Sequence, residues 1–341
     1  MAHITLGIGT SHSPMLNLSA SQWRHRAEVD FNNQKLTLSD GRTLSYADLL
    51  AERGPKFRDQ IDIGLMEQRE QGCHAALDRL GDVLERAAPD VVVIVGDDQA
   101  ELFSSDNQPA FAVFHGDEIV TTTGKYTKSS PDWMQQVGKG FLMDDIYRLA
   151  AASQFGWELI ERLVDMEVDV ASVGGVKDPS KAGFGHAYGF IVKRLFRHSI
   201  PVVPVMLNTY FAPNVPSANR CYDVGRKLRA AIEAMPADLK VAVVASGGLS
   251  HFVVDEQLDL RVIDAFREGN EQSLCTVPRE ALRSGSSEIL NWILTAGAVD
   301  HLPLQMAEYF PLYRSEAGTG VGAGFCYWAA EPLHNEERAI P

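Results

Sequence analysis

The sequence predicts an α/β fold in which a mixed, mainly parallel sheet flanked by helices forms the centre of one large domain, residues 1–341. Two observations predict it: short runs rich in valine and isoleucine, and longer amphipathic segments between them. Crossover helices bury both faces of a parallel sheet, so its strands are almost uniformly apolar. With 45% hydrophobic content over 341 residues, the chain can bury such a core.

The apolar runs that predict strands are, in chain order, residues 4–9 (ITLGIG), 91–95 (VVVIV), 110–114 (AFAVF), 168–173 (VDVASV), 201–207 (PVVPVML) and 241–246 (VAVVAS). Helical spacing of apolar residues occurs in residues 66–88 and 225–235. Residues 17–60 and 121–140 are polar and weakly periodic, and we expect loops there. The first of these is inserted between the first strand and the first long helix, and a lid or a subunit contact is an alternative to a plain surface loop.

The charge balance excludes several classes of partner. Lys and Arg total 31 against 45 Asp and Glu, a formal net charge of −14, so the chain lacks the positive field that attracts nucleic acid or anionic membranes. The N-terminus has no signal-peptide pattern, and no apolar run approaches the length of a membrane span. We expect a cytoplasmic protein and a homo-oligomer. The cysteines are widely spaced, as expected for buried free thiols in a reducing compartment: Cys73, Cys221, Cys275 and Cys326.

Polar side chains follow three of the predicted strands. His12 comes after the first (GTSHSP), Asp97, Asp98 and Gln99 after the second (GDDQ), and His251 after the last (GGLSH). Ligands of open α/β sheets collect at the carboxyl ends of strands, so these residues are candidates for a binding site. A hydrogen-bonded structural histidine is the alternative for His12 and His251. For Asp97 and Asp98 a turn or helix-cap role is the preferred interpretation.

Two further candidates lie outside strand ends. His186 in GFGHAYGF has glycines on both sides, which suggests a tight loop, and Glu288 in SSEILNW would lie in the first turn of a helix capped by a preceding serine. A carboxylate favoured by the helix N-terminus is the alternative for Glu288. Two histidines and one carboxylate would suit non-haem Fe(II), with His12 and Glu288 in suitable places. His251 or His186 would serve as general base.

Five of these motifs occur together in one known family. GTSHSP, VIVGDDQAELF, GFGHAYGF, VASGGLSHF and SSEILNWIL appear in an order that resembles the class III extradiol ring-cleavage dioxygenases. The resemblance extends from about residue 4 to residue 328, and GGLSH is its most specific part. A glutamine at position 99 and a long insertion after the first strand make the chain most similar to the 3-O-methylgallate dioxygenase branch.

The resemblance implies an enzyme that opens the ring of a catechol-type aromatic acid beside its diol, using O2 and Fe(II), in the catabolism of aromatic, lignin-derived compounds. Protocatechuate, gallate and 3-O-methylgallate are the implied substrates. By the resemblance, His12 and Glu288 are iron ligands, and Gln99 occupies the position of a second histidine ligand. His251 is the implied acid–base residue, and His186 the implied histidine beside the bound catechol.

Gln99 departs from the pattern of the family. An amide oxygen is neutral, as imidazole is, but it is a poorer donor to a late first-row metal. Gln99 therefore either ligates iron, or holds a water in the ligand's place, or leaves that place to Asp98, or marks the loss or exchange of the metal. The last case would make the chain a noncatalytic partner subunit. A metal-dependent hydrolase and a ring-cleaving dioxygenase of an aminophenol are further alternatives.

An acidic protein that binds an aromatic carboxylate needs a local cation or hydrogen-bond donors. The sequence offers Arg314, Ser315 and Thr319 in LYRSEAGTG, and Asn208 and Thr209 after the PVVPVML run. Surface exposure is the alternative for the arginine, and turn formation is the alternative for the others.

Overall fold

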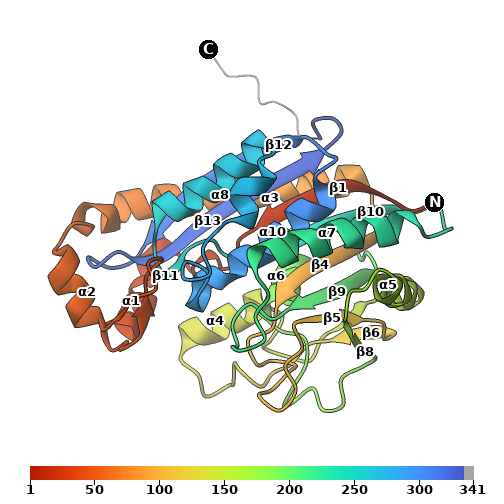
Figure 1. The fold of residues 1–341 in the computed structure, drawn as a ribbon. Coiled ribbons are helices and arrows are strands. Elements are labelled where there is room, and N and C mark those ends of the chain that lie inside the picture. Colours follow the sequence, from red (N-terminus) through yellow and green to blue (C-terminus); the bar gives the residue numbers. More distant parts are fainter. Residues whose placement is uncertain (334–341) are drawn as a thin grey trace.

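The structure is a computed structural model that describes residues 1–333. Within these residues a nine-stranded sheet has the order β11-β13-β1-β10-β4-β9-β5-β8, with β12 paired to β13 (Figure 1). Its strands are β1 (His3–Thr10), β4 (Val91–Asp97), β5 (Phe111–Phe114), β8 (Ala171–Val173), β9 (Val202–Leu207), β10 (Lys240–Ser246), β11 (His251–Val253), β12 (Leu304–Tyr313) and β13 (Thr319–Ala329). The central strands β1, β10, β4 and β9 are parallel, while β13 pairs antiparallel with β1, as the predicted mixed sheet requires.

Helices cover the sheet on both faces, as expected for α/β proteins. They are α1 (Arg24–Phe31), α2 (Tyr46–Arg53), α3 (Ile63–Ala87), α4 (Asp132–Gly140), α5 (Ser153–Asp165), α6 (His186–Leu195), α7 (Ala218–Glu233), α8 (Glu256–Glu268), α9 (Glu271–Cys275) and α10 (Ile289–Val299). Four 3-10 helices are also described, η1 (Pro14–Asn17), η2 (Ala20–Gln22), η3 (Arg58–Ile61) and η4 (Ser284–Glu288). Two small hairpin sheets pair β2 (Leu36–Thr37) with β3 (Thr43–Leu44), and β6 (Glu118–Val120) with β7 (Arg148–Ala150).

Strand β4 shows why the valine-rich runs form the centre of the sheet. Val93 packs into the core that contains Ile293 of α10, whereas Ile94 packs on the other face, in the core that contains Leu77 of α3. Successive strand residues point to opposite faces, so a strand with helices on both sides needs apolar residues at every position. Figure 1 shows α7 and α10 in front of the sheet and α3 behind it.

The predicted strands and the two long helices are present in the structure, with one strand shorter than expected: residues 168–173 contribute only β8. The sequence did not predict the hairpin of β12 and β13, which is antiparallel and contains the longest strands. Most of β12 is half-buried without alternation, so it lacks the period-two pattern that marks a strand. The apolar β13 contains glycines, which are uncommon in strand interiors.

The loop predictions for two polar segments were wrong. Residues 121–140 contain α4, whose nine residues include two glycines and therefore give a weak helical signal. Residues 17–60 contain α1, α2 and the β2–β3 hairpin. This insertion packs on α4: His25 stacks on Trp133, and the Gln136 amide donates to the Asn17 carbonyl.

The insertion is also tied to the sheet by a buried ion pair. Arg314, just after β12, donates through Nε and Nη2 to the two carboxylate oxygens of Asp30 in α1. Both side chains are only 3% exposed. A bidentate pair of this kind fixes the orientation of both partners, so α1 is held against the core.

Two smaller expectations can be compared with the structure. All four cysteines are free, and Cys73, Cys221 and Cys326 are buried while Cys275 is half-buried. Between residues 1 and 333 the structure contains no helix with the length and apolar character needed to cross a bilayer.

Candidate functional site

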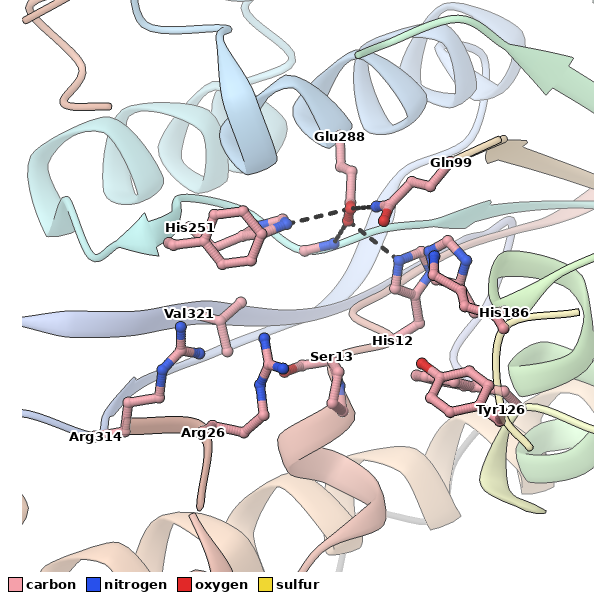
Figure 2. A pocket seen from close by; sticks show the side chains of 15 residues that line it. His12, Ser13, Arg26, Gln99, Tyr126, His186, His251, Glu288, Arg314 and Val321 are labelled. Atoms are coloured by element: carbon pink, nitrogen blue, oxygen red, sulfur yellow. Dashed lines mark hydrogen bonds and ion pairs between the residues drawn. The ribbon is translucent and has the colours of Figure 1, made fainter. Parts of the chain in front are cut away.

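A cavity of about 170 Å³ lies beyond the carboxyl ends of β1, β4 and β10 (Figure 2). The residues that line it are His12, Ser13, Pro14, Arg26, Gln99, Lys125, Tyr126, Phe141, His186, Gly248, His251, Phe252, Glu288, Arg314 and Val321. The structure thus brings together six of the residues named from the sequence, namely His12, Gln99, His186, His251, Glu288 and Arg314. They come from segments far apart in the chain, as expected where strand ends converge.

The structure does not bring the other proposed substrate-binding residues to the cavity wall. The Asn208 amide bonds to backbone groups of Phe211 and Asn214 and so organises its own loop. Ser315 and Thr319 hydroxyls bond to each other, 2.7 Å apart. The Thr209 hydroxyl is buried without a hydrogen-bond partner among the described residues. Ser, Thr and Asn are common in turns after strands whether or not they face a ligand, so the sequence alone does not separate the two roles.

Glu288 is the centre of the site. Its Oε1 accepts from Gln99 Nε2 at 3.0 Å and lies 3.2 Å from His251 Nε2. Its Oε2 accepts from the Gly248 amide at 2.7 Å and lies 3.2 Å from His12 Nε2. The dashed lines in Figure 2 converge on this carboxylate. Burial opposes ionisation, yet His251 and His12 hold the pKa of Glu288 well below its usual range.

The local structure around Glu288 differs from the prediction of a serine-capped helix. Glu288 ends η4 and is the N-cap of α10, and no serine side chain caps either helix. The Ser286 hydroxyl instead accepts from the His251 amide and donates to the His251 carbonyl. Ser286 therefore connects η4 to β11 and brings Glu288 beside His251.

The hydrogen bonds of His12 define its tautomer. The Ser246 hydroxyl donates its only hydrogen to the Ala187 carbonyl at 2.6 Å, so its oxygen can only accept from His12 Nδ1, 2.9 Å away. Nδ1 therefore carries a proton. Nε2, buried and without a hydrogen-bond partner among the described residues, faces Glu288. In the neutral form of the ring, which is the form that binds a metal, Nε2 would direct its lone pair at this carboxylate, an arrangement that a cation between them would stabilise.

His186 is positioned by a buried carboxylate that the sequence interpretation did not use. It is the first residue of α6 rather than part of a tight loop, and its Nδ1 lies 2.8 and 2.9 Å from the two oxygens of Glu101. Lys125 Nζ lies 3.1 Å from the same carboxylate. Burial opposes ionisation of Glu101, but His186 and Lys125 lower its pKa to about 2. Gly185 is required here because a Cβ would overlap the Glu101 carboxylate.

One ring nitrogen of His251 forms a hydrogen bond to the backbone, and the other faces the cavity. Nδ1 lies 2.9 Å from the Leu249 carbonyl, which can only accept, so Nδ1 donates. Nε2 faces Glu288. Burial lowers the pKa of His251, but Glu288 more than offsets this, and the net pKa is raised. The ring packs against Gly285, where a Cβ would overlap it.

The two aspartates after β4 have different roles. Asp98 accepts from the amides of Leu102 and Phe103, which agrees with the turn interpretation and leaves both of its oxygens committed. Asp97, the last residue of β4, is fully buried, so the turn or cap interpretation was wrong for it. Its Oδ1 accepts from Asn291, while Oδ2 has no partner among the described residues. Burial, and then the nearby Glu288, raise the pKa of Asp97.

These groups fit a divalent metal. Ligand atoms of His12, Asp97, His186 and Glu288 all lie within 4.8 Å of one another and all four residues are buried. Two carboxylates this close repel each other in a buried site unless a proton or a cation neutralises one. The unpaired atoms, His12 Nε2 and Asp97 Oδ2, are both typical metal donors. The Gln99 amide adjoins this group through Glu288.

The sequence interpretation missed several residues of the site, some of which had a usable signal and some of which had none. Glu101 lies two residues after Gln99 in the DDQAEL motif, so considering every acidic residue of that motif as a candidate could have found it. Arg26 and Tyr126 lie in the two polar segments expected to be loops, which carry no pattern that points to a cavity. Asp97 was recognised as a strand-end residue but assigned to a turn.

Two comparisons with known proteins show what the chain is similar to. Residues 54–325, most of the chain, match the family described as the catalytic LigB subunit of aromatic ring-opening dioxygenase. The chain is also 32% identical over 154 residues to a gallate dioxygenase of Pseudomonas putida. That alignment covers 42% of this chain and 42% of the relative, so it spans less than half of that protein. The chain therefore belongs to the family of catalytic LigB subunits of aromatic ring-opening dioxygenases.

Proposed function

We propose that this protein opens the aromatic ring of a catechol-type acid beside its diol, using Fe(II) and O2. The observation that carries the proposal is the arrangement of His12 and His251 around Glu288 at the wall of one cavity. It combines a histidine–carboxylate pair suited to a ferrous ion with a second histidine that can transfer protons. Family membership supports ring opening as the reaction.

His12, Gln99 and Glu288 would hold the metal. The His12 tautomer leaves Nε2 free to ligate, and Glu288 provides an anionic oxygen. Gln99 is held beside Glu288 by its amide nitrogen, which leaves its carbonyl oxygen for the metal. Asp97 adds a second negative charge next to these groups and would help to balance a divalent cation. When bound, Fe(II) supplies a common coordination sphere for the diol and O2 and an electronic path between them.

His251 and His186 would act on the substrate. The Nε2 of His251 faces the cavity beside Glu288, so it can take the second phenolic proton and return a proton to oxygen as the ring opens. Glu101 fixes the Nδ1 side of His186 and leaves the remaining nitrogen of that ring to hydrogen-bond a substrate oxygen. Phe141, edge-on to His186, supplies an apolar wall that limits water.

The cavity fits a small substrate. A cavity of about 150 Å³ can bind benzene, and this one of about 170 Å³ admits a single substituted ring. Gallate, 3-O-methylgallate and protocatechuate are the proposed substrates, and the gallate dioxygenase relative supports this class. Residues 17–60 would act as a lid, since Arg26 from this insertion lines the cavity.

The test is O2 uptake by protein loaded with Fe(II) under anaerobic conditions. We expect one O2 consumed per 3-O-methylgallate, gallate or protocatechuate, with an absorbing ring-opened product. Iron binding without turnover of any of the three would contradict the substrate class and favour another ring, such as an aminophenol. A protein that binds no iron would contradict the enzyme assignment and favour a noncatalytic partner subunit.

A further inference from the structure

The insertion of residues 17–60 contributes one charged side chain to the cavity. Arg26, in α1, lines the cavity together with Arg314 and Ser13. Figure 2 shows the guanidinium groups of Arg26 and Arg314 next to each other, on the side of Ser13 away from Tyr126. This cationic end of the cavity is distinct from the group of histidines around Glu288.

Arg26 differs from the other cations of the cavity in having no partner. Arg314 is paired with Asp30, and Lys125 is paired with Glu101. No described residue forms a hydrogen bond or ion pair with the Arg26 guanidinium, and its Nε is buried without a partner. Leaving a buried donor unsatisfied costs about 1–3 kcal/mol, and more for a charged group, so an unpaired arginine is unusual unless a ligand completes it.

The surroundings keep Arg26 charged but poorly compensated. Burial, and then the neighbouring Arg314, lower the pKa of Arg26 to about 10, so it stays protonated at neutral pH. Asp30 forms its hydrogen bonds with Arg314, and its attraction for the Arg26 charge is smaller than the opposing effects of burial and Arg314, so one positive charge at this end of the cavity is left unmatched. In a chain with a formal net charge of −14, this local excess of positive charge selects for an anionic group.

We propose that Arg26 binds the carboxylate of the aromatic substrate and selects aromatic acids over uncharged catechols. This inference rests on the proposed function, because that function places the diol at the opposite end of the ring, beside Glu288. A guanidinium presents parallel N–H donors that match both oxygens of a carboxylate. Arg314 is a positioning residue: its pair with Asp30 holds α1, and hence Arg26, at the cavity.

The substitution Arg26→Met tests this assignment against the matched control Arg24→Met, which removes an exposed arginine from the same helix. With Fe(II)-loaded protein and protocatechuate, Arg26→Met should raise KM about 10-fold to 100-fold with a smaller change in kcat, because a charge-assisted hydrogen bond is worth about 1.5–3 kcal/mol. Kinetics with catechol, which lacks the carboxylate, should change less than twofold. An equal loss with both substrates would overturn the assignment.

A binding experiment separates this inference from the proposed reaction. Titrations with 4-hydroxybenzoate and with phenol, followed by ligand NMR, need no turnover. Wild type and Arg24→Met should prefer 4-hydroxybenzoate at least 10-fold, Arg26→Lys should keep part of the preference, and Arg26→Met should lose it. If wild type shows the preference but consumes no O2, the reaction fails and the Arg26 subsite stands. If Arg26→Met keeps the preference, or wild type never has it, the subsite fails. Melting curves identify variants that misfold. If Arg26→Met misfolds, Arg26→Gln takes its place in the same titrations, with Arg26→Lys as the charged comparison.

Discussion

His12 Nδ1 lies 2.9 Å from the Ser246 hydroxyl, whose own hydrogen goes to the Ala187 carbonyl. One serine at the end of β10 thereby places a proton on Nδ1 of the histidine that follows β1 and leaves Nε2 of that ring to face Glu288. The parallel pairing of Thr10 with Ser246 brings the two strand ends together. Losing a partner that orients a metal-binding histidine in this way typically costs about 10-fold to 100-fold in metal affinity.

Ser246→Ala should weaken Fe(II) or Zn(II) binding about 10-fold to 100-fold, because His12 Nδ1–H loses its acceptor and the ring is free to reorient. Competition with a chelator of known affinity measures this loss. Ser315→Ala removes a buried hydroxyl that bonds Thr319 and lies outside the cavity, so it should leave affinity within about twofold. Equal effects of the two substitutions would show that the Ser246 bond has no special role.

Gln99→Ala should weaken metal binding, and Gln99→His should restore or tighten it, because imidazole is a better donor than an amide to a late first-row metal. Asp97→Asn is the matched comparison, since it alters the neighbouring carboxylate whose Oδ2 has no hydrogen-bond partner among residues 1–333. For each variant, the metal affinity and the EPR spectrum of the ferrous nitrosyl adduct are measured. Unchanged affinity in Gln99→Ala, with a loss in Asp97→Asn, would assign the third position to Asp97 instead.

Glu101→Gln should lower the free energy of unfolding by about 3 kcal/mol, because it leaves His186 and Lys125 without the buried carboxylate that both contact. Glu118→Gln is the control, since its ion pair with Arg148 is exposed and worth less than about 1 kcal/mol. Urea denaturation measures both. A loss for Glu101→Gln no greater than for Glu118→Gln would contradict the structural role given to this carboxylate.

Asp259 should make stability depend on pH near neutrality. Burial raises the pKa of this carboxyl group from 3.8 to about 7, although the Ser250 amide and the Ser250 and Tyr309 hydroxyls donate to it. The folded state therefore holds the proton more tightly than the unfolded chain. The stability from this group is complete below about pH 4 and is lost as pH rises to about 7, by at most about 4 kcal/mol, since each pKa unit is worth about 1.4 kcal/mol.

Asp259→Asn tests this linkage because the amide can still accept from the Ser250 N–H and donate to the hydroxyls. Denaturation at a series of pH values should show wild type losing stability relative to the variant between about pH 4 and pH 7. Parallel stability curves for the two proteins would mean that Asp259 titrates with an ordinary pKa.

The central sheet and the histidine positions were accessible from the sequence because local patterns encode them. Val91 to Val95 are apolar at every position, which only a strand covered on both faces requires. Gly247 and Gly248 before His251, and Pro14 after His12, mark turns at strand ends, where ligands bind. The strands and the mixed, mainly parallel sheet predicted from these short-range signals were confirmed.

The remaining features depend on contacts between distant segments. Arg26 reaches the cavity because α1 is held by Asp30 and Arg314, a pair separated by 284 residues. Glu101 faces His186 only because α6 begins beside the end of β4. No periodicity or turn signal encodes such pairings, so the sequence alone pointed to Arg314 as the substrate cation although its charge is already paired.

The most direct test of ring opening by O2 is isotope incorporation with protein loaded with Fe(II) and supplied with 18O2 and protocatechuate. The account predicts that both oxygen atoms of one O2 enter the ring-opened product, detected as a mass increase of about 4 Da by mass spectrometry. Oxygen consumption without label in an opened product, or ring opening that proceeds equally without iron, would contradict it.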